Sequence, residues 1–176
     1  MAEYDSSDEM IKDACSLFKK TAGVMNFLLQ RTVSPPSPDL TSENIRMMQL
    51  LMLQQAQEVI VTKSLRDSKT PSLVAKLAWQ CVVYCEELID ACASNDFAKN
   101  DQKEILSMAR VKTDFFKALA FFSMGVSSRD AQSYGEAVGY FRKAKTFFDQ
   151  AEKSIGVYED ACASAFLYAR DVIEGL

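Results

Sequence analysis

The sequence predicts an all-α protein of about six helices, arranged in antiparallel hairpins within a single helical domain over residues 1–176. Apolar residues recur at three- and four-residue spacing along most of the chain. No stretch alternates with a period of two, so we expect no sheet. A chain of 176 residues that is 48% hydrophobic and 25% charged is long and apolar enough to bury one sizeable core.

The first helix is expected over residues 5–31. Asp8 and Glu9 lie in its first turn, where the helix dipole favours acids. An apolar stripe follows at helical spacing, made of Ile11, Cys15, Phe18, Ala22, Met25 and Leu29. Gly23 interrupts this pattern at a cost of about 1 kcal/mol relative to alanine, which predicts close packing of a neighbouring helix there.

Residues 32–41 contain three prolines in four positions and predict a crossover loop. The second helix is expected over residues 41–65, opened by Thr41 with Asn44 or Glu43 behind it. Residues 47–53 are apolar almost all round the helix, so this helix must be surrounded by others. Three of its methionines, Met47, Met48 and Met52, are expected in the core.

A polar turn at residues 66–70 leads into the third helix, which is expected to start at Thr70-Pro71 and to run to Ala93. Proline is favoured at the first helical position, where its missing N–H group costs nothing. The second and third helices therefore form a hairpin around which the rest of the chain is organised.

Three more helices are expected over residues 101–125, 130–155 and 158–175. Gly125 is expected to end the first of them and Gly156 the second. The segment SYGEAVGYFRKAKTF (133–147) resembles the second helix of a tetratricopeptide repeat, with Ala137, Phe141 and Ala144 at small-large-small positions. A generic helical hairpin explains the same pattern equally well, because no second copy is found at the expected period.

Composition excludes several kinds of function. The net charge is −4 and the chain has no basic run, which argues against nucleic-acid binding. No apolar stretch reaches the ~18 residues of a membrane span. The first ten residues are acidic, so we expect no signal or transit peptide. An odd number of cysteines, five, predicts reduced thiols in the cytosol.

Catalytic and metal sites are not expected, and neither is a cofactor. The chain has no histidine, which removes the usual general base and the commonest zinc ligand. Cys81, Cys85 and Cys92 share one helix but are spread over ~16 Å, too far apart to hold one zinc ion. We interpret them as buried structural thiols.

The apolar residues Ile60, Leu73 and Leu77 are the candidate binding site. Ile60 lies near the end of the second helix, and the other two lie one turn apart at the start of the third. In an antiparallel hairpin the three share one surface. Periodicity alone favours ordinary core at these positions, and the alternative is an exposed patch that receives an apolar helix from a partner.

Several runs of the sequence resemble the BRO1 domain of the Alix and yeast Bro1 proteins. They are LMLQQAQE (51–58), KSLRDS (63–68) and LVAKLAWQ (73–80), with FKKTAGVMNFL (18–28), PDLT (38–41), YGEAVGYFRKA (134–144) and DVIEGL (171–176) on either side. Details of KSLRDS, ALAFFSMG and DVIEGL are most similar to the His-domain protein tyrosine phosphatase (non-receptor type 23-like) branch.

This resemblance implies an adaptor of the ESCRT pathway that binds the C-terminal amphipathic helix of an ESCRT-III subunit, a charged multivesicular body protein. The family's three-residue apolar patch corresponds to Ile60, Leu73 and Leu77, and its acidic residue corresponds to Asp8 or Glu9. Nearby acids would then orient a basic partner helix. The protein would be cytoplasmic, recruited to endosomes for sorting into multivesicular bodies, and would meet the membrane only through its partner.

The resemblance covers the central part of the family's domain, without its N-terminal sheet and early helices. An HCxxGxxR phosphatase signature is absent, so we expect no enzyme activity. We expect a fragment, a truncated isoform or a shortened paralogue of a BRO1 protein. Two alternatives stay open: a tetratricopeptide-like scaffold that binds a peptide near Tyr134 and Phe141, and a truncated remnant that binds nothing.

Overall fold

The structure, a computed structural model, describes residues 2–31, 40–93 and 101–155. These ranges hold five helices and no strand, so the all-α prediction is confirmed. The helices are α1 (Ala2–Arg31), α2 (Ser42–Arg66), α3 (Pro71–Ala93), α4 (Asp101–Asp130) and α5 (Tyr134–Ile155). The sixth predicted helix, over residues 158–175, lies outside the described residues.

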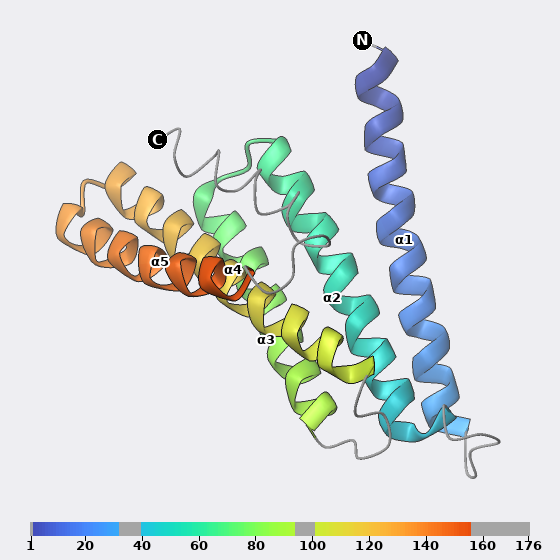
Figure 1. The fold of residues 1–176 in the computed structure, drawn as a ribbon. Coiled ribbons are helices and arrows are strands. Elements are labelled where there is room, and N and C mark those ends of the chain that lie inside the picture. The colour runs from blue at the N-terminus through green and yellow to red at the C-terminus, as the bar shows by residue number, and fades with distance from the viewer. Residues whose placement is uncertain (1, 32–39, 94–100, 156–176) are drawn as a thin grey trace.

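Each helix packs against the next one along the chain (Figure 1). The first three run antiparallel and side by side, with α2 between α1 and α3. The α4–α5 hairpin lies against α3 and is inclined to the first three helices. Helix α1 is therefore an outer layer that packs on α2 through one face only, and its N-terminal end projects beyond the other helices.

Helix α2 begins as the sequence predicts. The Thr41 hydroxyl accepts a hydrogen bond from the backbone N–H of Asn44 at 3.2 Å, which satisfies one of the free donors at the helix start. Of the methionines expected in the core, Met47 is buried and Met52 is partly buried. Met48 is 37% exposed, so the prediction was wrong for that residue.

The core runs through α2, α3 and α4 in two clusters. One is built around Val61, Val74, Ala78, Cys81, Val82, Phe116, Leu119 and Ala120, and the other around Met47, Leu50, Leu88, Cys92 and Ala109. Cys81, Cys85 and Cys92 are buried free thiols, as expected. The small residues of α3 thus let it pack closely between its two neighbours.

Two glycines have other roles than those predicted. Gly125 does not end α4, which continues to Asp130; a Cβ atom at Gly125 would lie 2.6 Å from the Phe141 ring of α5. The glycine therefore makes room for that ring. Gly23 was expected to admit a neighbouring helix, yet it is exposed and a Cβ atom there would meet nothing within 4 Å.

The turn between α4 and α5 consequently lies later than predicted, and α5 begins at Tyr134 instead of residue 130. Gln132 in this turn has a positive φ of 60°, and Ser68 in the α2–α3 turn has one of 48°. Both turns reverse the chain through a single left-handed residue, which polar side chains tolerate better than branched ones. Gly156 lies outside the described residues.

No helix in the described ranges combines the length and the apolar character that crossing a bilayer requires.

Candidate docking groove

A groove of about 700 Å³ lies where the end of α2 and the start of α3 meet the N-terminal half of α1. We call it the α1–α3 groove. It is lined from α1 by Ile11, Lys12, Cys15, Ser16, Lys19 and Lys20, from α2 by Val59, Ile60, Lys63 and Ser64, and from α3 by Leu73 and Leu77, with Asp67 and Lys69 from the turn. In Figure 1 this region is at the end of α2 where the chain turns into α3.

The apolar floor contains all three residues that the sequence singled out. Leu73 is 41% exposed, whereas Ile60 and Leu77 are half-buried. Leu77 also packs against the core, and its carbonyl oxygen accepts a hydrogen bond from Gln57 Nε2 at 3.0 Å. The α2–α3 hairpin therefore holds the three side chains on one surface, as the antiparallel arrangement predicted.

The rim of the groove is mainly basic. Lys12, Lys19 and Lys20 contribute from α1 and form no ion pair with any side chain in the described ranges. Lys63 and Lys69 contribute from the opposite side. The α1 lysines are spaced so that they recur on one face of the helix, which places their positive charge along one edge of the apolar floor.

The acids near the groove are held in ion pairs. Lys63 Nζ lies 2.8 Å from Asp8 Oδ2 and 3.3 Å from Asp67 Oδ2, and Lys69 Nζ lies 3.8 Å from Asp67 Oδ2. The hydrogen bond from Lys63 lowers the pKa of Asp8, and the bond to Asp8 raises the pKa of Lys63. Both groups therefore stay charged at neutral pH.

The structure places the two predicted acids differently. Asp8 joins the edge of the groove through Lys63, but Glu9 is exposed and does not line it. The reason is that one residue along a helix turns the side chain by about 100°. Lysines outnumber acids along the rim, so the acids that were expected to orient a basic partner helix are the minority of its charged residues.

The sequence pointed to α1 only through Asp8 and Glu9, and the other α1 residues of the groove were not predicted. Ile11 and Cys15 were predicted only as part of the apolar stripe of the first helix, and both line the groove. The available signal was the set of lysines at positions 12, 19 and 20 beside that stripe. A basic edge along an apolar helix face is typical of a surface that stays partly open to a charged partner.

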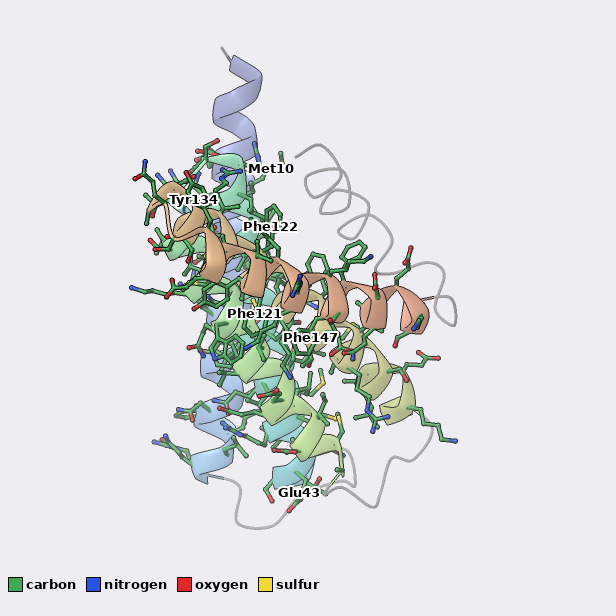
Figure 2. The ribbon with its side chains drawn as sticks, turned by 90° about the vertical axis from the view of Figure 1, so that its left-hand side faces the viewer. Met10, Glu43, Phe121, Phe122, Tyr134 and Phe147 are labelled. Carbon is green, nitrogen blue, oxygen red and sulfur yellow. The ribbon has the colours of Figure 1, made fainter. Side chains whose placement is uncertain are left out.

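The residues proposed as the peptide-binding face of a tetratricopeptide-like scaffold have different environments in the structure. Phe141 packs into the α4–α5 interface, with its ring centroid 5.6 Å from that of Phe122. Phe121 of α4 and Phe147 of α5 stack with their ring centroids 5.6 Å apart. Both are labelled in Figure 2, as is Tyr134 at the start of α5, which is 63% exposed. Phe141 thus holds the hairpin together and does not face an open concave surface.

No group of three or more potential metal ligands occurs in the described ranges. Burial raises the pKa of the Cys81 thiol and raises that of Cys85 to about 12. These thiols are protonated at neutral pH and are poor nucleophiles. Cys15, the thiol in the groove, is half-buried and its Sγ donates to the carbonyl oxygen of Ala56 at 3.7 Å.

Comparison with protein families shows a match to the BRO1-like domain over residues 1–173. Mouse tyrosine-protein phosphatase non-receptor type 23 is 31% identical over 172 residues, which cover 96% of this chain and 10% of that protein. The vacuolar protein-sorting protein bro-1 of Neurospora crassa is 29% identical over 143 residues, or 81% of this chain and 14% of that protein. The chain thus spans only about a tenth of the length of these relatives.

Solved structures share the fold. An ALIX BRO1 CHMP4C complex superposes with a TM-score of 0.78 at 20% identity, covering 96% of this chain and 47% of that one. A Bro1 domain described as a structural basis for endosomal targeting gives a TM-score of 0.75 at 20% identity, covering 94% and 45%. At this level of identity these similarities establish the helical architecture.

Proposed function

The chain belongs to the BRO1 family, and we propose that its α1–α3 groove docks an amphipathic helix from an ESCRT-III subunit. The observation that carries the proposal is the meeting of Ile60, Leu73 and Leu77 on one partly exposed surface. A BRO1 complex with CHMP4C is among the solved structures of this fold, which supports a partner of the ESCRT-III type.

The groove suits a helix that is apolar on one side. Leu73 and Leu77 lie one turn apart on α3 and Ile60 faces them from α2, so they offer a continuous strip to apolar side chains of a partner helix. Covering such side chains fully contributes roughly 1.5–3 kcal/mol each before the cost of ordering the partner. The apolar floor therefore supplies most of the binding free energy.

The charges on the rim determine which charge the polar face of the partner helix should carry. Lys12, Lys19 and Lys20 would pair with acidic residues that flank the partner's apolar face. Asp8 and Asp67 are already neutralised by Lys63 and Lys69, so they offer little attraction to a basic helix. An acidic amphipathic helix is thus the preferred ligand. Its orientation in the groove would be fixed by the α1 edge.

In the cell this module would act as an adaptor without catalytic activity. It would bring ESCRT-III to the cytoplasmic face of endosomes during sorting into multivesicular bodies. The vacuolar-sorting relatives support that setting. The phosphatase activity in the name of another relative belongs to that protein, of which this chain covers a tenth.

The test is calorimetric titration of the chain with a synthetic C-terminal helix of an ESCRT-III subunit. Leu73→Asp is the main variant, because Leu73 is 41% exposed and contributes little to the core. We expect affinity to fall about tenfold or more. Val138→Asp on α5, where the native side chain is 49% exposed, is the matched control and should bind as wild type does.

A second titration tests the contribution of the rim lysines to binding. The double variant Lys12→Glu and Lys19→Glu should weaken binding and flatten its dependence on salt, because surface ion pairs are screened as salt rises. Unchanged affinity in a folded Leu73→Asp variant would refute docking in this groove. Tighter binding by the double lysine variant would refute an acidic partner.

A further inference from the structure

Gln57 of α2 lies between the core and the floor of the α1–α3 groove. Its side-chain Nε2 donates a hydrogen bond to the backbone carbonyl oxygen of Leu77 in α3 at 3.0 Å. That carbonyl belongs to a helix, and its second lone pair is able to accept a further donor. Gln57 is partly buried and is not among the residues that line the groove. A partner helix in the groove would therefore not contact Gln57 directly.

The neighbours of Gln57 on α2 show what this bond connects. Ile60 and Val61 follow it by three and four residues, so both lie on the same side of the helix. Ile60 lines the groove, whereas Val61 is buried in the core with Val74 of α3. The hydrogen bond thus joins α2 to α3 at the boundary where the core ends and the apolar floor begins.

Two other restraints hold α3 against α2. In the turn, the backbone N–H of Lys69 donates to the carbonyl oxygen of Ser64 at 3.0 Å, but Leu77 lies about 10 Å further along α3. Apolar packing resists separation of the two helices, and it has no preferred direction of its own. A hydrogen bond is directional, so the bond from Gln57 favours one rotation of α3 at the position of Leu77.

From this geometry we infer that Gln57 is a positioning residue of the groove, which holds Leu77 facing Ile60 before a partner helix arrives. The inference rests on the proposed docking in the α1–α3 groove. A floor that already has its bound shape reduces the ordering cost of binding. Loss of the bond should therefore weaken docking, although no contact with the partner is removed.

The side of the groove formed by α1 is held by different contacts. Cys15 Sγ donates to the carbonyl oxygen of Ala56 at 3.7 Å, and a thiol is a weak donor. Lys63 Nζ pairs with Asp8 Oδ2 at 2.8 Å. Neither contact involves Gln57, so a substitution there changes the restraint between α2 and α3 and leaves the α1 side intact.

The test is calorimetric titration of the full chain with a synthetic C-terminal helix of an ESCRT-III subunit. Gln57→Met keeps the length of the side chain and removes its donor, and we expect the dissociation constant to rise about threefold to tenfold. Gln55→Met is the matched control. Gln55 is also partly buried on α2, but its side chain forms no hydrogen bond with another described residue, so this variant should bind as wild type does.

A double-mutant cycle separates positioning from a general loss of stability. In a Leu77→Ala background the side chain that Gln57 positions is already gone, so Gln57→Met should weaken docking further by less than about twofold. In a Lys12→Glu background, which changes only the α1 edge, Gln57→Met should keep its full effect. A loss of stability would instead weaken binding equally in both backgrounds.

The outcomes distinguish this inference from the proposed function. If the wild-type chain binds no ESCRT-III helix, the docking proposal itself is overturned. If Leu73→Asp abolishes binding while Gln57→Met binds as wild type does, only the positioning role is overturned. Equal losses in Gln57→Met and Gln55→Met also overturn it. Gln57→Asn, whose amide is one methylene too short to reach the carbonyl, is the second variant and should show the same loss as Gln57→Met.

Discussion

Lys63, near the end of α2, lies 2.8 Å from the carboxylate of Asp8 in α1 and joins two residues 55 positions apart in the sequence. The same ammonium reaches Asp67 in the turn that leads to α3. One side chain of α2 therefore connects α1 with the turn that precedes α3. These contacts fix the distance between the lysines of α1 and the apolar floor of the groove.

The pH dependence of this contact follows from its two shifted groups. Lys63 holds the pKa of Asp8 below its ordinary value of 3.8, so the stabilising contribution of Asp8 is present above pH 3.8 and is lost as the pH falls through the lower folded-state value. The pKa of Lys63 is raised above 10.5, so its contribution is present below pH 10.5 and lost at higher pH.

We therefore expect Asp8→Asn to lower the free energy of unfolding by a constant amount between about pH 5 and pH 9, with the difference shrinking in more acidic solution. Urea denaturation of the wild type and the variant across this range measures it. Glu9→Gln, at an exposed neighbour, should change stability little. A difference that appears or vanishes near pH 7 would contradict the assignment.

The contact between Gly125 and Phe141 yields a packing prediction. A Cβ atom at position 125 would lie 2.6 Å from the ring, so Gly125→Ala should displace Phe141 and destabilise the protein by about 1–3 kcal/mol. Thermal and chemical denaturation measure this loss. Adding Phe141→Leu should recover part of it, because the smaller side chain leaves room for the methyl group.

Gly139→Ala is the matched control for that experiment. Gly139 is also inside a helix, but a Cβ atom there would meet nothing within 4 Å. Alanine is the better helix former by about 1 kcal/mol, so this variant should be at least as stable as wild type. Equal effects of the two substitutions would show that packing against Phe141 is not the cause.

The apolar half of the candidate site could be predicted from the sequence, because a hairpin of two helices determines which residues near its turn come together. Ile60, Leu73 and Leu77 belong to such a hairpin. The part contributed by α1 could not be predicted in the same way. Where α1 crosses α2 depends on side-chain packing between distant residues, and local periodicity does not specify it.

The extent of the helices was predictable to within a few residues, except around Gly125. A glycine near the end of an apolar periodic segment is typical of a helix terminus, and it equally marks a place where another side chain packs closely. Only the position of Phe141 in the folded chain distinguishes the two. The same limitation applies to the sign of the groove's charge, because Asp8 of α1 is neutralised by Lys63, which comes from α2.

A partly buried ion pair between Glu58 and Lys112 links α2 to α4. The Oε2 and Nζ atoms lie 2.6 Å apart with side chains 21% and 12% exposed, and Glu58 Oε2 also accepts a hydrogen bond from the buried Gln54 amide at 2.8 Å. Lys112→Met should destabilise the protein by about 1–3 kcal/mol, because it leaves the carboxylate without its charged partner. The double variant Glu58→Gln and Lys112→Met should lose less than the single one.

Denaturation of the single and double variants supplies the measurement. Lys145→Met provides the comparison, since Lys145 pairs with Asp149 across an exposed face with side chains 78% and 44% exposed. Removal of that pair should change stability by less than about 0.5 kcal/mol. If the double variant is as unstable as Lys112→Met alone, the unpaired carboxylate is not the cause of the loss.

Thiol reactivity provides a direct report on the groove. Burial raises the pKa of Cys81 and Cys85, and the thiolate is the reactive form, so neither should react with iodoacetamide in the native protein. Cys15 is half-buried and lines the groove, and it should react first. The Cys162→Ser background removes the cysteine that lies outside the described residues.

A helix bound in the groove would cover Cys15. We therefore expect a saturating ESCRT-III peptide to slow the alkylation of Cys15 several-fold in the wild type, as measured by mass spectrometry of the modified peptide. The same peptide should give no protection in the Leu73→Asp variant, where docking is lost. Protection that persists in Leu73→Asp would mean that the peptide covers Cys15 without using the apolar floor, and would place the binding surface on α1 alone.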